Sequence, residues 1–208
     1  ITYYYRLGKL QACPSRRSTL RKKKKKDKDG NIIPDRTPKQ RKNNTKFTFA
    51  RYMFAFIRKR FGDLPVWKIA AAQRGMTDDN LIQSTNYKYL DEKGKILDME
   101  GFQVSLGPLA LPLNLRATRN GTLVSITWDD PRDEPSAAPT DRMMVGIFYA
   151  DYRDTFTLEK ETGTTRRDGK CEIILRDDDG EVCIHPFFAR ADNTAFSEDK
   201  AITLPDTE

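Results

Sequence analysis

The side chains that could do chemistry are few, and the only histidine is His185. It lies in the alternating run VCIHPFF, directly before Pro186. A general base must lie beside a nucleophile or a substrate, and proline in a strand is typical of a sheet edge. We therefore predict that His185 is a structural residue at an edge and not a general base.

Other catalytic and cofactor motifs are absent from the sequence. It contains no Gly-X-Ser-X-Gly, no P-loop, no His-Glu-X-X-His and no dinucleotide fingerprint. The carboxylates at 129–130 and 177–179 adjoin proline or glycine, which is typical of turns. Neither DDDG nor DKDGN has the spacing of a calcium loop. We predict no catalytic residue, no metal, no cofactor and no enzymatic activity.

Three cysteines make neither a disulfide framework nor a zinc set; they are Cys13, Cys171 and Cys183. The tract 171–183 predicts a hairpin that turns at DDDG. In such a hairpin Cys183 would lie opposite Arg176 or Ile174, and not opposite Cys171. We therefore expect Cys171 and Cys183 to be small buried residues without a cross-strand disulfide.

Helical signals fill the segment 37–94. Thr37 and Gln40 form a capping-box pattern around Pro38, which is favoured at the first helical position. Residues at three- and four-residue steps then predict a core-facing helix: Phe47, Phe49, Ala50, Met53, Phe54, Ile57 and Phe61. Gly62 ends this helix. A second helix is expected before Gly75, and a third from Thr77.

The hydrophobic period changes to two after about residue 95. Short alternating runs are expected as strands at 102–107, 113–120, 122–130, 141–151, 154–160, 171–177, 181–191 and 200–204. This spacing predicts an antiparallel β-sandwich of the immunoglobulin or fibronectin type III kind, with Trp128 in its core. The fold class is α+β, divided into an N-terminal strand and basic arm (1–36), a helical segment (37–94) and the sandwich (95–208).

Charge is segregated along the chain. Residues 1–60 hold 20 Lys and Arg against three acids, a net charge of +17, and the remainder carries −10. The run Lys22, Lys23, Lys24, Lys25 and Lys26 fits a solvated loop, an acidic protein surface or a nucleic acid. Nucleic acid is the weaker interpretation, because strand alternation separates Tyr4 from Tyr3 and Tyr5. The helix is also expected to turn its aromatic side chains toward the core, away from its arginines.

The order of these tracts resembles an uncharacterised Bacteroidota family of small proteins, a domain of unknown function. The resemblance rests on YYRLGKLQACPSR, TPKQRKNNTKFTFARYMF, SITWDDPRDEPSAAPTDRMMVGIFYAD and EVCIHPFFARADNTAFSEDKAITL. It implies a front strand, a helix that opens with Thr and Gln, and a final strand, but no activity. The lysine run departs from the family pattern as an insertion.

The sequence favours a structural subunit of a surface filament or similar polymer, assembled head to tail. The expected contacts are Tyr3, Tyr4, Tyr5, Arg6 and the lysine run, with Asp129, Asp130, Asp177, Asp178 and Asp179 as acceptors. No run is long enough to span a membrane, and we expect an extracellular or cell-surface location. The alternatives are a protein that binds nucleic acid or another polyanion, for example in a virion, an adhesin that presents loops, and a monomer whose front strand pairs within the chain.

Overall fold

A computed structural model describes residues 2–6, 9–13, 28–29, 37–130, 136–152, 155–176 and 180–206. The chain forms two compact units, residues 1–41 and 42–208. In the first unit, β1 (Thr2–Arg6) and β2 (Lys9–Cys13) make an antiparallel pair with Tyr4 opposite Gln11. The predicted front strand is therefore half of a two-stranded ribbon.

Helix α1 (Pro38–Phe61) begins at the predicted capping box. The Thr37 backbone N–H donates to Gln40 Oε1 at 2.9 Å, and the Gln40 N–H donates to Thr37 Oγ1 at 3.2 Å. Its buried residues are Ala50, Met53, Phe54, Ile57 and Phe61. Phe47 and Phe49 were also predicted to be in the core, but each is 42% exposed; Phe47 lies at a groove between α1 and α3.

The two further helices are α2 (Val66–Gln73) and α3 (Asp78–Asn86). The predicted cap of α3 is confirmed, since Thr77 Oγ1 accepts from the Asn80 N–H at 3.3 Å. Short 3-10 turns are η1 (Tyr87–Tyr89), η2 (Ala150–Tyr152) and η3 (Arg166–Asp168). None of the helices in the described ranges is long and apolar enough to cross a membrane.

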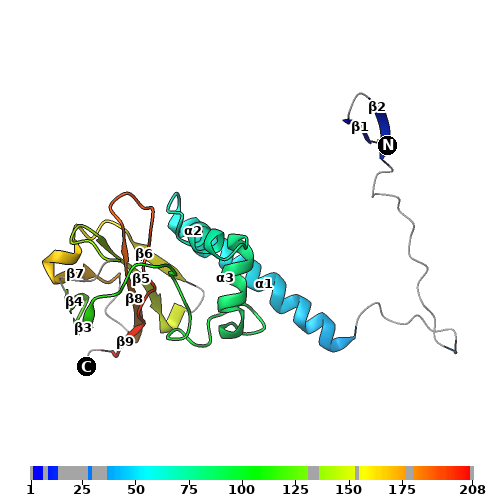
Figure 1. The fold of residues 1–208 in the computed structure, drawn as a ribbon. Helices are drawn as coiled ribbons and strands as arrows, with labels where there is room; N and C mark the ends of the chain where they lie inside the picture. Colours follow the sequence, from blue (N-terminus) through cyan, green and yellow to red (C-terminus); the bar gives the residue numbers. More distant parts are fainter. Residues whose placement is uncertain are drawn as a thin grey trace. The chain divides into compact units, whose positions relative to one another are not determined.

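Seven strands follow, in two antiparallel sheets that face each other (Figure 1). Their bounds are β3 (Leu113–Asn120), β4 (Leu123–Asp129), β5 (Arg142–Tyr149), β6 (Phe156–Glu159), β7 (Lys170–Ile174), β8 (Val182–Ala189) and β9 (Ile202–Leu204). The strand orders are β3-β4-β7 and β6-β5-β8-β9. The fold class is therefore α+β, with a C-terminal sandwich of the fibronectin type III kind.

The predicted hairpin between β7 and β8 is wrong. β7 pairs with β4 and β8 pairs with β5, so the chain crosses from one sheet to the other after β7. Cys171 lies opposite Ile126 and Cys183 lies opposite Phe148. The two cysteines are buried and free, and they belong to different sheets. A sandwich needs such a crossover because both sheets contribute to one core.

Strand β8 is buried along its whole length. Val182, Ile184 and Phe188 face the three-stranded sheet. Cys183 and Phe187 face the opposite way, into a cluster with the helices. Residues on both faces of this strand are thus core residues, and its partner β5 has the same arrangement.

The expectation that His185 lies at a sheet edge is also wrong. His185 is fully buried and lies opposite Gly146 of β5, in an inner strand of the four-stranded sheet. Strand β9 pairs with β8 only from Val182 to Ile184, so Pro186 lies beyond the end of that ladder. A proline is tolerated there because its missing N–H would not have had a ladder partner on that side.

The segment 102–107 was expected to be a strand and is not one. Side chains satisfy its backbone donors instead: the N–H groups of Val104 and Ser105 donate to Asp199 Oδ1 at 2.9 and 2.8 Å. The Gln103 N–H donates to Asn86 Oδ1 at 2.8 Å. The alternating pattern reflects burial of Phe102 and Val104 against the helical side of the sheet.

A buried arginine, Arg166, connects several segments at one end of the sandwich. Arg166 is 1% exposed, and its Nη2 donates to the Ala110 carbonyl at 2.6 Å. Its Nε lies 3.5 Å from the fully buried Asp141 carboxylate. The guanidinium also lies 4.4 Å from the Phe188 ring centroid, and its backbone carbonyl accepts from Trp128 Nε1 at 2.8 Å. Through its side chain and its backbone, Arg166 thus connects four separate segments.

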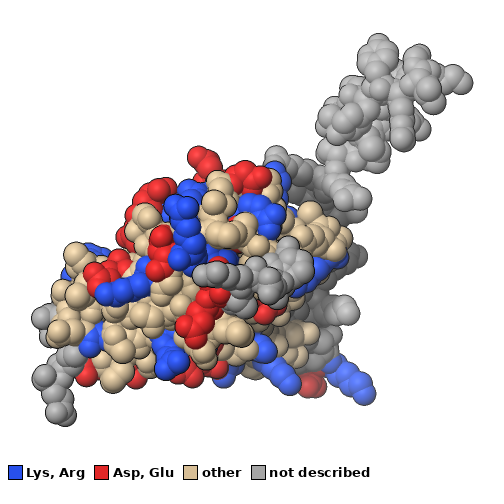
Figure 2. All heavy atoms as spheres, turned by 60° about the vertical axis from the view of Figure 1, so that its left-hand side comes forward, with Lys and Arg blue, Asp and Glu red and all other residues tan. Residues whose placement is uncertain are grey.

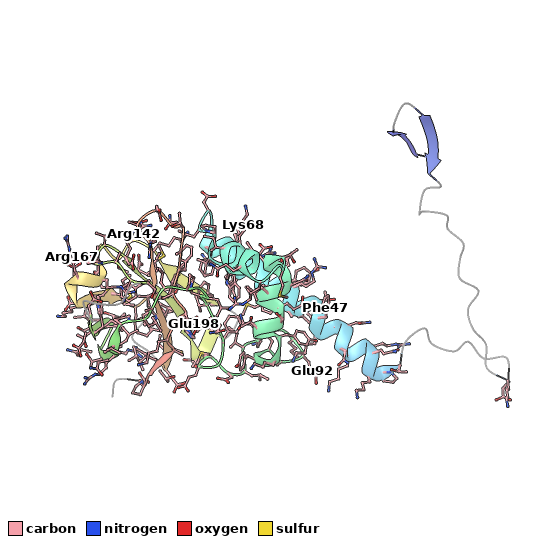
Figure 3. The ribbon with its side chains drawn as sticks, in the orientation of Figure 1. Phe47, Lys68, Glu92, Arg142, Arg167 and Glu198 are labelled. Carbon is pink, nitrogen blue, oxygen red and sulfur yellow. The ribbon has the colours of Figure 1, made fainter. Side chains whose placement is uncertain are left out.

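We expect Arg166→Met to lower the free energy of unfolding by about 3–5 kcal/mol, because it removes the nearer cation from the buried Asp141 carboxylate and leaves Arg190 Nε at 3.8 Å. Adding Asp141→Asn should recover part of this loss. The control is Arg167→Met, since Arg167 projects into solvent (Figure 3) and should change stability by less than about 0.5 kcal/mol. Urea unfolding measures all three; equal stability of the Arg166 and Arg167 variants would contradict the account.

Candidate functional site

The predicted contact residues are only partly within the described ranges. Lys22 to Lys26 and Asp177 to Asp179 lie outside them. Tyr3, Tyr4, Tyr5 and Arg6 lie in β1, whose backbone pairs with β2. The structure therefore does not test the contact between the basic and acidic groups, which stays a prediction.

Two of the predicted acceptors, Asp129 at the end of β4 and Asp130 directly after it, differ in environment. Asp129 is exposed and accepts from Asn114 Nδ2 at 2.6 Å. The Asp130 side chain is 22% exposed, and its Oδ1 lies 3.8 Å from Arg166 Nη1. Asp130 thus faces a buried cation of its own chain, which leaves Asp129 as the better placed of the two for an outside partner.

Strand β7 is an edge of the three-stranded sheet. It pairs with β4 on one side, and no described strand pairs with its other side. The Trp128 N–H donates to the Gly169 carbonyl, and the Leu175 N–H donates to the Thr122 carbonyl. Because backbone groups alternate in direction along a strand, the even-numbered residues turn theirs to the open edge. Glu172, at the middle of β7, is the central residue whose backbone groups face the open edge.

The outer face next to this edge carries apolar surface. Ile174 is 78% exposed and lies opposite Leu123, which is 40% exposed. Lys170 and Glu172 continue the face with an exposed ion pair at 2.6 Å. On the face shown in Figure 2, acidic and basic side chains are interspersed, with uncharged surface between them.

An unpaired strand edge can accept another strand through backbone hydrogen bonds. Glu172 and Ile174 were not predicted as site residues, because β7 was expected to pair with β8. A signal was present in KCEII, where Ile174 is apolar at a position that alternation assigns to the outer face. The edge of β7 is therefore the candidate site, and it is a site for another strand.

A second cluster joins a thiol, an imidazole and a carboxylate. Cys183 Sγ lies 3.4 Å from His185 Nε2, and His185 Nδ1 lies 2.6 Å from Asp199 Oδ2. The order of groups is that of a nucleophile, a base and an orienting acid. Cys183 and His185 are fully buried and the Asp199 side chain is 3% exposed. The cluster as it stands positions backbone segments, since Asp199 also holds Val104 and Ser105.

The charge of this cluster follows from its contacts. Burial favours the neutral imidazole, but the hydrogen bonds and charges of Asp199 and Cys183 outweigh it and raise the pKa of His185 to about 9. His185 is then an imidazolium at neutral pH, paired with the Asp199 carboxylate. Among the residues that the structure describes, no three His, Cys, Asp or Glu side chains are placed to hold a metal ion.

No family model matches the chain, and no curated protein matches it. A crystal structure of the chicken CNTN1 FN1–FN3 domains is similar at 7% sequence identity and a TM-score of 0.36. The match covers 50% of this chain and 34% of that one, so the matched part is about a third of that structure. The Bacteroidota resemblance stays a prediction.

The imidazolium makes stability depend on pH. The pKa of His185 in the folded chain, about 9, lies above its ordinary value of 6.5, so its contribution is complete below about pH 6.5 and is lost as pH rises through 9. We expect the free energy of unfolding to fall by on the order of 3 kcal/mol across this window. Urea unfolding from pH 6 to 9.5 measures it.

His185→Gln should be less stable and should lack this loss above pH 6.5. The control is Ile184→Val, which shortens a side chain on the other face of β8 and keeps the ion pair; it should retain the wild-type slope. A slope that persists in His185→Gln would show that another group is responsible.

Proposed function

We propose that this chain is a non-enzymatic structural subunit that assembles by strand addition. The β1–β2 ribbon of one copy lies along the open edge of β7 of the next copy. The observation that carries the proposal is the outward-facing backbone of β7, with Glu172 at its middle and the exposed Ile174 beside it. The ribbon and the β7 edge are different surfaces of one copy, so the contact is head to tail and extends into a filament or ring.

The ribbon gives the proposal its second support. A two-stranded antiparallel pair is marginally stable in water, and it becomes stable when it joins a larger sheet. Residues 1–41 form a unit of their own around β1 and β2. The β1–β2 pair is a good donor, because a neighbouring sheet would supply a third strand to it.

Charge would set the direction of the contact. In the sequence the lysine run follows β2, and Asp177, Asp178 and Asp179 follow β7. A ribbon added at the β7 edge would carry its own basic segment toward the acidic turn of the next copy. Contacts between exposed charges weaken with salt, so assembly should weaken as ionic strength rises.

Glu172→Pro should abolish assembly, because proline removes the central N–H of the open edge and leaves the bonds to β4 in place. The control is Glu172→Ala, which loses the same side chain and the same ion pair with Lys170 but keeps the N–H. Sedimentation velocity and negative-stain imaging of both variants and wild type measure the effect. Circular dichroism confirms that both variants are folded.

Deletion of residues 1–36 removes the donor and should also give monomers. Two results would contradict the proposal: polymers that form equally well from Glu172→Pro, or polymers unchanged by the deletion. A wild-type protein that stays monomeric at high concentration and low salt would contradict it as well.

A further inference from the structure

The helical segment is strongly basic, and self-assembly through β7 does not use it. Residues 37–90 contain eleven Lys and Arg against three Asp, a net charge of +8. Helix α1 contains no acidic residue at all. An excess of this size on one segment attracts polyanions and makes their binding sensitive to salt.

A groove of about 620 Å³ runs between α1 and α3. From α1 it is lined by Phe47, Arg51 and Tyr52, and from α3 by Asn80 and Gln83. Phe47 projects from α1 where this helix extends beyond α3 (Figure 3). The groove thus combines aromatic rings, a guanidinium and two amides that can each donate and accept hydrogen bonds.

The charges within the groove leave one cation available. Arg58 Nη1 lies 2.6 Å from Asp79 Oδ1 and 3.5 Å from Asp78 Oδ2, so both acids at this end already have a partner. Arg51 is exposed and forms no ion pair with any carboxylate of the described ranges. An incoming anion therefore meets an arginine whose charge is not yet compensated.

The aromatic side chains of the groove favour a nucleic acid over an acidic peptide as its ligand. Tyr52 is 68% exposed and Phe47 is 42% exposed, although the sequence had placed the aromatic residues of α1 away from its arginines. They lie beside Arg51 in the same groove. Exposed rings next to a guanidinium provide stacking surfaces for bases and a contact for phosphate. An acidic peptide would use the charge and leave the rings without a role.

We propose that this groove binds single-stranded nucleic acid, with bases stacked on Tyr52 and Phe47 and a phosphate on Arg51. A single strand is required because paired bases are already stacked and cannot expose their faces to side chains. Basic residues elsewhere on α1 would follow the backbone of the strand. This proposal goes beyond assembly through β7, and the two use different surfaces.

Fluorescence anisotropy with a labelled oligothymidylate tests the proposal. Tyr52→Ala should weaken binding about 5- to 100-fold, as expected for the loss of one stacking platform. Its control is Tyr152→Ala, which removes an exposed tyrosine in η2 and should leave binding unchanged. Arg51→Ala should reduce the slope of log K against log salt by about 1, and the exposed Arg116→Ala should reduce it less.

The same titrations include the matching duplex and polyglutamate as competitors. Weak competition by both supports the proposal. It is overturned if polyglutamate competes as well as the oligonucleotide, if Tyr52→Ala and Tyr152→Ala bind alike, or if nothing binds at low salt. Repeating the titration with Glu172→Pro separates the two proposals, because that variant should bind the strand without assembling.

Discussion

The burial of β5 and β8 on both faces is the constraint on which the rest of the structure depends. One face of this strand pair packs against the three-stranded sheet, and the other packs against the helices. Gly146 of β5 shows how close the second layer lies, because an added Cβ would come within 3.0 Å of Val104. Once both faces are covered, the surfaces left for partners include the outside of the helices and the outer sheet with its β7 edge. The two proposed functions use these two surfaces.

Buried charges hold the layers in register. His185 and Asp199 connect β8 to the segment that crosses the helical side, while Arg166 and Asp141 connect loops at one end of the sandwich. A buried ion pair contributes little net stability relative to apolar residues, but removal of one partner is costly. These pairs therefore determine which loop lies where. They also explain why two aspartates, Asp141 and Asp199, are buried in the core.

Local signals predicted the helices and most strands, and contacts between distant segments explain what was missed. The helix cap at Thr37 and the eight residues of β3 were predicted correctly, because residues close in the sequence determine both. The position of His185 depends on which strands flank β8, and no local pattern contains that information. The segment 102–107 alternates like a strand because it is buried on one side, while Asp199, far along the chain, satisfies its N–H groups. Phe47 was misplaced because its periodicity continues to a position on α1 that lines a groove and stays partly exposed.

The segregation of charge along the sequence now has a structural counterpart. The helical segment is basic and carries exposed rings, and the sandwich is acidic and carries an open strand edge. The central claim is that this edge accepts a strand from another copy. Residue-resolved hydrogen exchange at increasing protein concentration tests it most directly. The account predicts that the outward-facing amides of Glu172 and Ile174 become protected as copies associate, while amides of β7 that already bond β4 stay as they were. Exchange at Glu172 that is independent of concentration, in a sample that does assemble, would contradict it.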